Sequence, residues 1–301
     1  MIRFFDGGMG SMLNLAAGEL PEKLNISEPE RVFAVHKGYA DAGAEFITAN
    51  TFGANSLKYD NVDELVKAGV ALAKKAGKYV ALDIGPTGKL LKPMGDLEFE
   101  RAVELFAEVV RAGKDGSDVA IIETMSDMYE LKAAVIAVKE NSDLPIITSM
   151  IFDESGRLLT GGDVKSAVAM LEGLRVDAIG FNCGLGPKQM IPLVKELREC
   201  TSLPILVMPN AGLPESVDGK TVYNVSPDEF AQDMREIAKL GVSILGGCCG
   251  TTPKHIAKMI ELCKDIPDNV PEKKNDTVVC SYSSAVTIGE KPVVIGERIN
   301  P

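Results

Sequence analysis

An alternation between short apolar segments and longer helical patterns runs along most of the chain. Each unit starts with an apolar run rich in β-branched or aromatic residues, passes through a turn of Gly, Asn, Asp or Thr, and ends in an amphipathic helical pattern. About eight such units fit into the first 265 residues. This count favours a closed (β/α)8 TIM barrel, an α/β fold, and an open doubly wound sheet is the structural alternative.

The pattern predicts where the elements lie. Strands are expected at residues 2–6, 46–51, 79–83, 119–123, 146–151, 178–183, 205–208 and 243–247. Helices are expected near residues 28–42, 61–77, 98–115, 127–140, 163–174, 187–199, 226–240 and 253–264. Several predicted helix starts carry capping signals, such as Ser226 and the pair Thr252-Pro253.

The composition changes after about Asp265. The stretch DIPDNVPEKKNDT is polar and contains proline, and the following VVCSYSSAVTIGEKPVVIGERINP has apolar, strand-like pieces without a helix. We therefore expect a barrel over 1–265 and a C-terminal linker with a strand-like tail over 266–301.

Charge and composition exclude several classes of partner. The formal net charge of −11 works against sequence-independent binding to nucleic acid or to an anionic membrane. The sequence has no uninterrupted run of 18 apolar residues, and its N-terminus, MIRFFDGG, lacks the pattern of a signal peptide. These features predict a cytoplasmic protein with a small-molecule substrate, whose six cysteines are reduced.

Polar residues gather at the predicted strand ends. In a barrel of this type the carboxyl ends of the strands form the active-site face. The residues at these positions are Asp6, Asn50, Thr51, Asp83, Glu123, Asp153, Cys183, Asn210 and the vicinal pair Cys248-Cys249.

Three of these residues are cysteines from the sixth and eighth strands. Three converging thiolates suit tetrahedral zinc and leave a fourth position open for a substrate. The flanking glycines, Gly246, Gly247 and Gly250, would relieve crowding around the vicinal pair. The alternative is that these cysteines are small core residues, which is the interpretation we keep for Cys200, Cys263 and Cys280.

Two carboxylates and a glycine-rich loop complete the candidate site. Asp6 and Glu123 each end an apolar strand, where a pair of carboxylates could hold an amino group, although a salt bridge at the rim or a loop cap is the alternative. The stretch GGMGS could present backbone N–H groups to a carboxylate. His36 and His255 lie in helical patterns and are expected in the core or on the surface rather than in catalysis.

Six motifs together resemble the homocysteine S-methyltransferase family. They are DGGMGSML at 6–13, TANTFGANSLKY at 48–59, IIETMSD at 121–127, GFNCG at 180–184, MPNAG at 208–212 and GGCCGTTPKHI at 246–256. The likeness is greatest to the N-terminal homocysteine-binding module of cobalamin-dependent methionine synthases.

The resemblance implies a role for each motif. Zinc would be bound by the catalytic residues Cys183, Cys248 and Cys249, and the homocysteine sulfur would take the open position, which Asn210 could fill in the absence of substrate. The remaining matched residues would bind the substrate: Asp6 and Glu123 its amino group, the loop of Gly7, Gly8 and Ser11 its carboxylate, with Asn182 beside them.

The resemblance also implies the reaction, which is methylation of homocysteine to methionine. The methyl group would come from methylcobalamin on a corrinoid-binding module or protein. The tail VVIGERINP is similar to the first strand of a folate-binding module, so a folate-binding partner is expected too. Two alternatives stay open: a standalone methyltransferase that uses S-methylmethionine, S-adenosylmethionine or betaine, and a noncatalytic zinc-stabilised module that docks a corrinoid protein.

Overall fold

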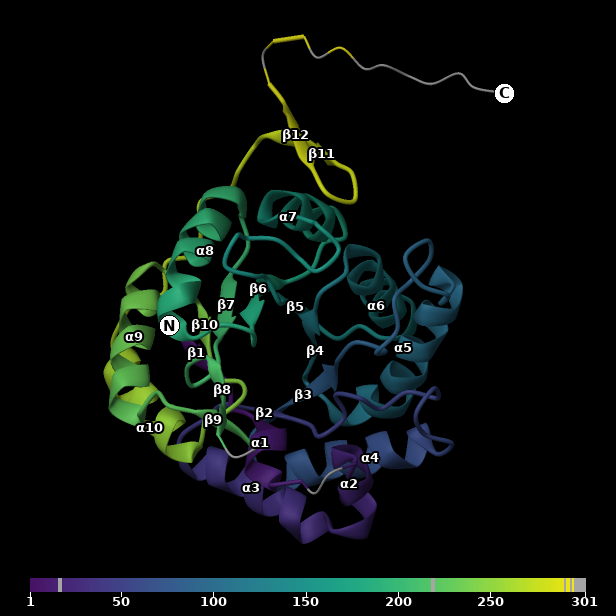
Figure 1. Ribbon diagram of the computed structural model, residues 1–301, viewed down its shortest axis with the longest axis vertical. Helices are drawn as coiled ribbons and strands as arrows, with labels where there is room; N and C mark the ends of the chain where they lie inside the picture. The colour runs from purple at the N-terminus through teal and green to yellow at the C-terminus, as the bar shows by residue number, and fades with distance from the viewer. Residues whose placement is uncertain (16–17, 218–219, 290, 293, 295–301) are drawn as a thin grey trace.

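Eight parallel strands form a barrel in the computed structural model, which describes residues 1–15, 18–217, 220–289, 291–292 and 294 (Figure 1). The barrel strands are β1 (Arg3–Phe4), β2 (Phe46–Thr48), β3 (Tyr79–Ile84), β4 (Val119–Met125), β5 (Ile146–Met150), β6 (Ala178–Asn182), β7 (Ile205–Met208) and β10 (Ile244–Leu245). They neighbour one another in the order β1-β10-β7-β6-β5-β4-β3-β2. A parallel bridge between Phe5 and Phe46 joins the two ends of this order. The predicted closed barrel is confirmed, and the open sheet is wrong.

Helices surround the strands as an outer ring (Figure 1). They are α3 (Pro29–Asp41), α4 (Val62–Lys75), α5 (Phe99–Gly113), α6 (Met128–Asn141), α7 (Val164–Gly173), α8 (Pro187–Cys200), α9 (Pro227–Lys239) and α10 (Pro253–Cys263). Two predicted capping residues act as expected: Ser226 accepts a hydrogen bond from the Glu229 backbone N–H, and Thr252 forms a capping box with His255. No described helix has the length and apolarity that crossing a membrane requires.

Short helical elements that the periodicity did not predict lie at two places in the chain, after β1 and after α5. The helices α1 (Met9–Leu13) and α2 (Leu24–Ser27) and the 3-10 turn η1 (Pro21–Lys23) precede α3, and a second 3-10 turn, η2 (Lys114–Gly116), follows α5. All are shorter than two helical turns, too short for an amphipathic period to develop.

Aromatic rings lie at the amino-terminal end of the barrel. Phe46 and Tyr79, the first residues of β2 and β3, stack with ring centroids 5.3 Å apart, and Phe5 stacks on Phe46 at 4.8 Å. The Arg3 guanidinium lies 5.2 Å from the centre of the Phe46 ring. Apolar residues such as Ile121 and Leu206 fill the interior above them, so the barrel is a packed core and its site must lie at the carboxyl ends of the strands.

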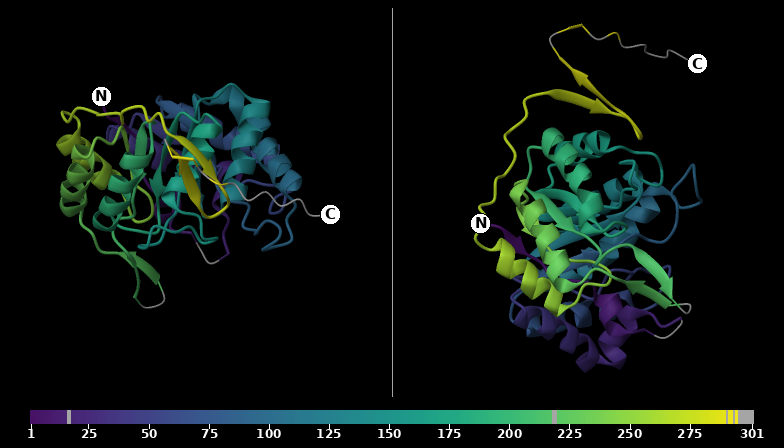
Figure 2. Two further views of the ribbon diagram at one scale, coloured as in Figure 1. Left: turned by 90° about the horizontal axis from the view of Figure 1, so that it is seen from above. Right: turned by 60° about the vertical axis from the view of Figure 1, so that its left-hand side comes forward.

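Two hairpins lie outside the barrel. The first joins β8 (Pro214–Val217) to β9 (Lys220–Tyr223) between β7 and α9, and it projects from the body of the protein (Figure 2). It was not predicted from the sequence.

The second hairpin is the predicted strand-like tail, β11 (Thr277–Cys280) and β12 (Ala285–Ile288). It lies against α7, and at its tip Tyr282 donates a hydrogen bond to Asp127 and packs on Tyr129 with ring centroids 4.7 Å apart. Of the tail motif VVIGERINP, only Val294 belongs to the described residues, so the predicted folate-module strand falls outside them. The boundary at residue 265 stays a prediction.

Candidate metal centre and substrate pocket

A pocket of about 250 Å³ opens at the carboxyl ends of the strands. Most of the predicted rim residues line it, namely Asp6, Asn50, Asp83, Glu123, Cys183, Cys248 and Cys249, together with the loop from Gly7 to Ser11. Thr51, Asp153 and Asn210 do not. The volume is that of a small metabolite rather than a nucleotide or a polymer.

The three predicted cysteines meet at this pocket. Their sulfur atoms all lie within 4.8 Å of one another, and the Sγ atoms of Cys183 and Cys249 are 4.0 Å apart. Zinc–sulfur bonds of about 2.3 Å in a tetrahedron would separate the sulfurs by about 3.8 Å. The cluster therefore fits a zinc ion with little rearrangement.

Backbone hydrogen bonds hold the vicinal pair on both sides. The Cys248 N–H donates to Pro209 O at 2.9 Å, and the Cys249 carbonyl accepts from the Ala211 N–H at 2.9 Å. Gly250 follows with φ of +77°, and a Cβ there would lie 2.3 Å from the Tyr223 ring. Cys183 itself adopts φ of +57°, which is uncommon for a residue other than glycine. The backbone thus turns all three thiols towards one point.

The pKa values of the thiols differ strongly within the cluster. Hydrogen bonds from Cys183 and Cys248 lower the pKa of the Cys249 thiol to about 3. Hydrogen bonds to the other two thiols, with burial, raise the pKa of Cys248 well above its usual range. Without a cation the cluster therefore stabilises a single thiolate, whereas a bound metal ion would stabilise all of them.

Asn182 connects the cysteine cluster to the acidic side of the pocket. It is fully buried, and its amide Nδ2 donates to Glu123 Oε2 at 3.2 Å and to Thr124 Oγ1 at 2.8 Å and lies 3.8 Å from Cys248 Sγ. Its Oδ1 accepts from Ser149 Oγ at 2.7 Å. Asn182 was predicted to touch the substrate, but it is absent from the pocket lining. Its contacts are those of a residue that orients Glu123 and Cys248.

Asn210 is buried near the vicinal cysteines. Its backbone N–H donates to Leu185 O at 3.0 Å, but its side-chain Oδ1 has no partner among the described residues. Its neighbour Pro209 accepts the hydrogen bond of Cys248. A buried amide oxygen without a donor is costly, and a metal ion would satisfy it, as the sequence interpretation expects for a fourth ligand.

The predicted carboxylates lie in the same pocket. Asp6 is buried, and its carboxylate accepts hydrogen bonds from the Thr48 N–H at 2.9 Å and the Thr48 hydroxyl at 2.7 Å. Burial raises the pKa of Asp6 to about 7 in spite of these bonds. Burial, with repulsion from Asp6 and Cys249, raises the pKa of Glu123 to about 8. Among the described residues that line the pocket there is no Lys, Arg or His to pair with either carboxyl, and a substrate ammonium group could supply the positive charge.

The glycine-rich loop packs directly on the cysteine loop. The Gly8 N–H donates to Thr251 Oγ1 at 3.1 Å, and a Cβ on Gly8 would lie 2.7 Å from Cys248 O. Ser11 Oγ accepts from the Gly250 N–H at 3.3 Å, and the buried Tyr39 hydroxyl donates to Thr251 O at 2.9 Å. The glycines are needed because the two backbones approach too closely for a side chain.

Tyr223 lies beside the cysteine cluster and was not predicted. It ends β9, its ring lies against Gly250, and its hydroxyl helps to lower the pKa of the Cys249 thiol. The TVY stretch of alternating β propensity at 221–223 was the one signal of a strand there. Nothing in that stretch pointed to the pocket, because the hairpin brings Tyr223 to Gly250 from 27 positions earlier in the sequence.

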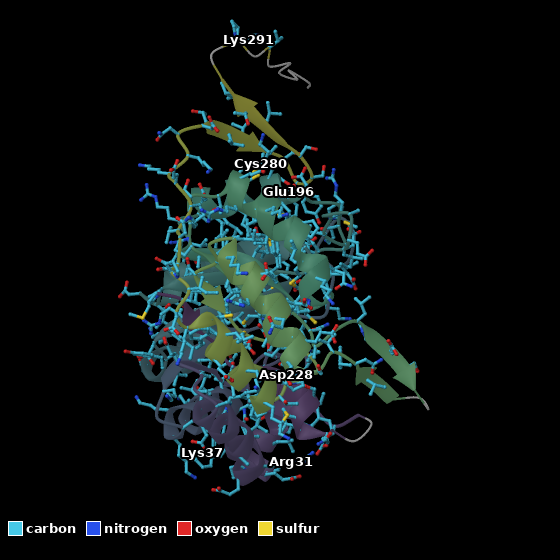
Figure 3. All side chains as sticks on the ribbon, turned by 90° about the vertical axis from the view of Figure 1, so that its left-hand side faces the viewer. Arg31, Lys37, Glu196, Asp228, Cys280 and Lys291 are labelled. Atoms are coloured by element: carbon cyan, nitrogen blue, oxygen red, sulfur yellow. The ribbon has the colours of Figure 1, made fainter. Side chains whose placement is uncertain are left out.

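The remaining cysteines and histidines lie elsewhere. Cys200 and Cys263 end α8 and α10, and Cys280 lies on the tail hairpin, as Figure 3 shows. His36 is buried in α3, and His255 caps α10 and contacts Val225 O at 3.0 Å through Nε2. None of these residues lines the pocket. Cys263 is buried, as predicted for a core cysteine, and Cys200 is half-buried, but Cys280 is exposed, so the core interpretation is wrong for Cys280.

A family model described as homocysteine S-methyltransferase matches residues 3–263. The chain is 32% identical to a methionine synthase of Mycobacterium leprae (strain TN) and 31% identical to one of Mycobacterium tuberculosis (strain ATCC 25618 / H37Rv), each over 98% of this chain. It spans 28% and 27% of the lengths of these two relatives.

A solved structure has a similar fold. The metallated form of the homocysteine methyltransferase MmuM from Escherichia coli superposes with a TM-score of 0.73 at 23% identity, over 86% of this chain and 95% of that one. The apo form of the same protein gives a TM-score of 0.69 over 87% of this chain.

Proposed function

The chain belongs to the homocysteine S-methyltransferase family, and from this membership we propose that it activates the thiol of homocysteine on zinc for methylation to methionine. The observation that carries the proposal is the convergence of three sulfur atoms within 4.8 Å at the edge of a small pocket that also contains carboxylates. A thiol substrate with an amino group matches both halves of this pocket.

Cys183, Cys248 and Cys249 would hold the zinc ion, and the unpartnered Asn210 Oδ1 is the candidate for the fourth ligand before substrate binds. Zinc at this position would lower the pKa of a bound thiol, which is otherwise near 8.5, and so supply a thiolate at neutral pH without a separate general base. This is consistent with the absence of histidine from the described pocket lining.

The chain's own residues would bind and orient the substrate. Asp6 and Glu123 would accept hydrogen bonds from its ammonium group, and the loop from Gly7 to Ser11 would receive its carboxylate. With the substrate held at its amino and carboxylate groups, its sulfur would be oriented to form a bond to the methyl carbon of the donor. The bond between the methyl group and the donor would break, and its electron pair would stay on the donor. Asn182 would keep Glu123 and Cys248 in position.

A methylcorrinoid is the donor we propose, carried as methylcobalamin by a corrinoid-binding module or protein. Identities of 31–32% to proteins named methionine synthase support this choice, as does the tail that resembles a folate-binding module. In this proposal residues 1–265 are the homocysteine-binding barrel, and residues 266–301 are a linker and the start of a segment that resembles a folate-binding module. We place the protein in the cytoplasm in this proposal, because that compartment keeps partly exposed cysteines reduced.

A donor panel tests the proposal. The zinc-loaded chain is supplied with homocysteine and, separately, with free methylcobalamin, S-methylmethionine, S-adenosylmethionine and betaine, and methionine is measured. We expect turnover with methylcobalamin. Turnover with a sulfonium donor but not with methylcobalamin would show that the proposed donor is wrong and leave the proposed thiol activation standing. A metal centre that does not bind homocysteine would indicate a noncatalytic module that docks a corrinoid protein.

A further inference from the structure

Asp83 is a buried carboxylate in the pocket with no assigned role. It lies near the carboxyl end of β3, is only 5% exposed, and lines the same pocket as the metal cluster. Its Oδ1 has no hydrogen-bond partner among the described residues. The neighbouring Thr51 hydroxyl donates to the backbone oxygen of Asp83 at 2.8 Å rather than to its carboxylate.

The described lining of the pocket contains no compensating positive charge. Asp6, Asp83 and Glu123 all line it, and neither Lys, Arg nor His does so. Burial raises the pKa of Asp83 well above its usual range, and repulsion from Glu123 adds to this effect. A buried carboxylate with an unsatisfied oxygen destabilises the empty pocket, so a cationic ligand would be favoured there.

The order of strands puts Asp83 across the barrel from the thiols. The cysteines follow β6 and β10, which flank β7, and β3 lies opposite β7 in the ring of eight strands. Asp6 follows β1 and Glu123 lies on β4, so Asp83 lies between the two other carboxylates on the far side. A ligand with its sulfur at the cluster would extend its other end towards this acidic side.

We infer that Asp83 is a third ligand for the ammonium group of the substrate, and that it makes the pocket select thiols carrying a free, protonated amine. This inference rests on the proposed function, because it takes the metal cluster as the anchor for sulfur. It goes further in assigning Asp83, which lies between Asp6 and Glu123 in the ring of strands, as an additional residue that binds the ammonium group and strengthens the preference for an amine.

The test compares two thiols that differ only in the amine. Homocysteine and 4-mercaptobutanoate are titrated calorimetrically into the zinc-loaded chain and into its Asp83→Asn variant. We expect Asp83→Asn to weaken homocysteine binding on the order of tenfold to a hundredfold, the value of a hydrogen bond to a charged group, and to leave 4-mercaptobutanoate binding unchanged. Asp153→Asn is the matched control, because Asp153 is exposed, follows β5, and does not line the pocket.

A second variant, Asp83→Ser, repeats the comparison if Asp83→Asn folds poorly. Thermal unfolding of the ligand-free variants separates recognition from structure, since removal of an unpaired buried carboxylate should leave stability unchanged or higher. Equal losses for both thiols, or none for either, would overturn the inference. Equal binding of both thiols by the wild-type chain would overturn the inference and leave the proposed thiol activation on zinc standing, whereas binding of neither would overturn both.

Discussion

The Sγ atoms of Cys183 and Cys249 lie 4.0 Å apart although 66 positions separate the two residues in the sequence. The strand order produces this contact, because β6 and β10 are separated by β7 alone in the sheet. Positive φ at Cys183 and at Gly250 turns the two loops towards each other. The cysteine cluster thus depends on the order of the strands and not on either loop alone.

Replacing Cys248 by alanine removes one of the three sulfur ligands. We expect zinc affinity to fall by at least about a hundredfold, since even the outer partners of metal ligands are worth about 10- to 100-fold. Chelator competition measures the loss, and Cys200→Ala, at the end of α8, is the control. Retention of a full zinc equivalent by Cys248→Ala under competition would contradict the assignment.

Tyr223→Phe removes the hydroxyl that helps to lower the pKa of the Cys249 thiol and keeps the ring over Gly250. We expect metal affinity about tenfold lower, because the sulfur loses a hydrogen-bond donor. The sulfur-to-metal charge-transfer band of the cobalt(II)-substituted chain should shift as well, a change that a purely structural role would not cause. Tyr129→Phe, on the exposed face of α6, serves as the control. If Tyr223→Phe changed neither the charge-transfer band nor the metal affinity, the proposed role of the hydroxyl would be wrong.

Glu123→Gln gives a stability change that depends on pH. Burial raises the pKa of Glu123 to about 8, so between the unfolded and folded values the folded state binds more protons than the unfolded state, and stability falls as pH rises. The metal-free variant should match the wild type near pH 5 and be more stable by a few kcal/mol near pH 9, at about 1.4 kcal/mol per pKa unit. Urea unfolding at the two pH values measures this, with exposed Glu154→Gln as the control. The same difference at both pH values would exclude the mechanism.

Gly250→Ala tests the turn after the vicinal cysteines. The new Cβ would lie 2.3 Å from the Tyr223 ring at φ of +77°, so we expect a loss of about 1–3 kcal/mol in the free energy of unfolding together with weaker metal binding. Gly173→Ala is the control, because a Cβ added at Gly173 would meet no neighbouring group within 4 Å outside its own helix. Equal stability of the two variants would show that the turn tolerates a side chain.

The barrel was predictable because each β/α unit encodes its own period, from Phe46 to Cys263. The exact ends of the strands were harder to predict. The strand expected at residues 2–6 is regular only over Arg3–Phe4, since the chain turns into the pocket at Asp6, and the strand expected at 243–247 shortens to Ile244–Leu245. These departures occur where the backbone leaves the sheet to form the site.

The site was predictable where residue type alone suggests chemistry, as with Cys183, Cys248 and Cys249. Tyr223 was missed because only the folded hairpin β8–β9 brings it to the cluster. Asp83 was placed on the rim by its strand, but its unpartnered oxygen is a property of the folded pocket. The position of Asn182 behind the pocket likewise depends on the contacts of β4 and β5 with β6.

Metal retention on reduced, anaerobically purified protein tests the central claim most directly. Zinc is measured by mass spectrometry during a chelator challenge, with and without homocysteine. The proposed site predicts about one zinc ion per chain, released more slowly when homocysteine is present. A chain that binds no zinc under these conditions would contradict the claim.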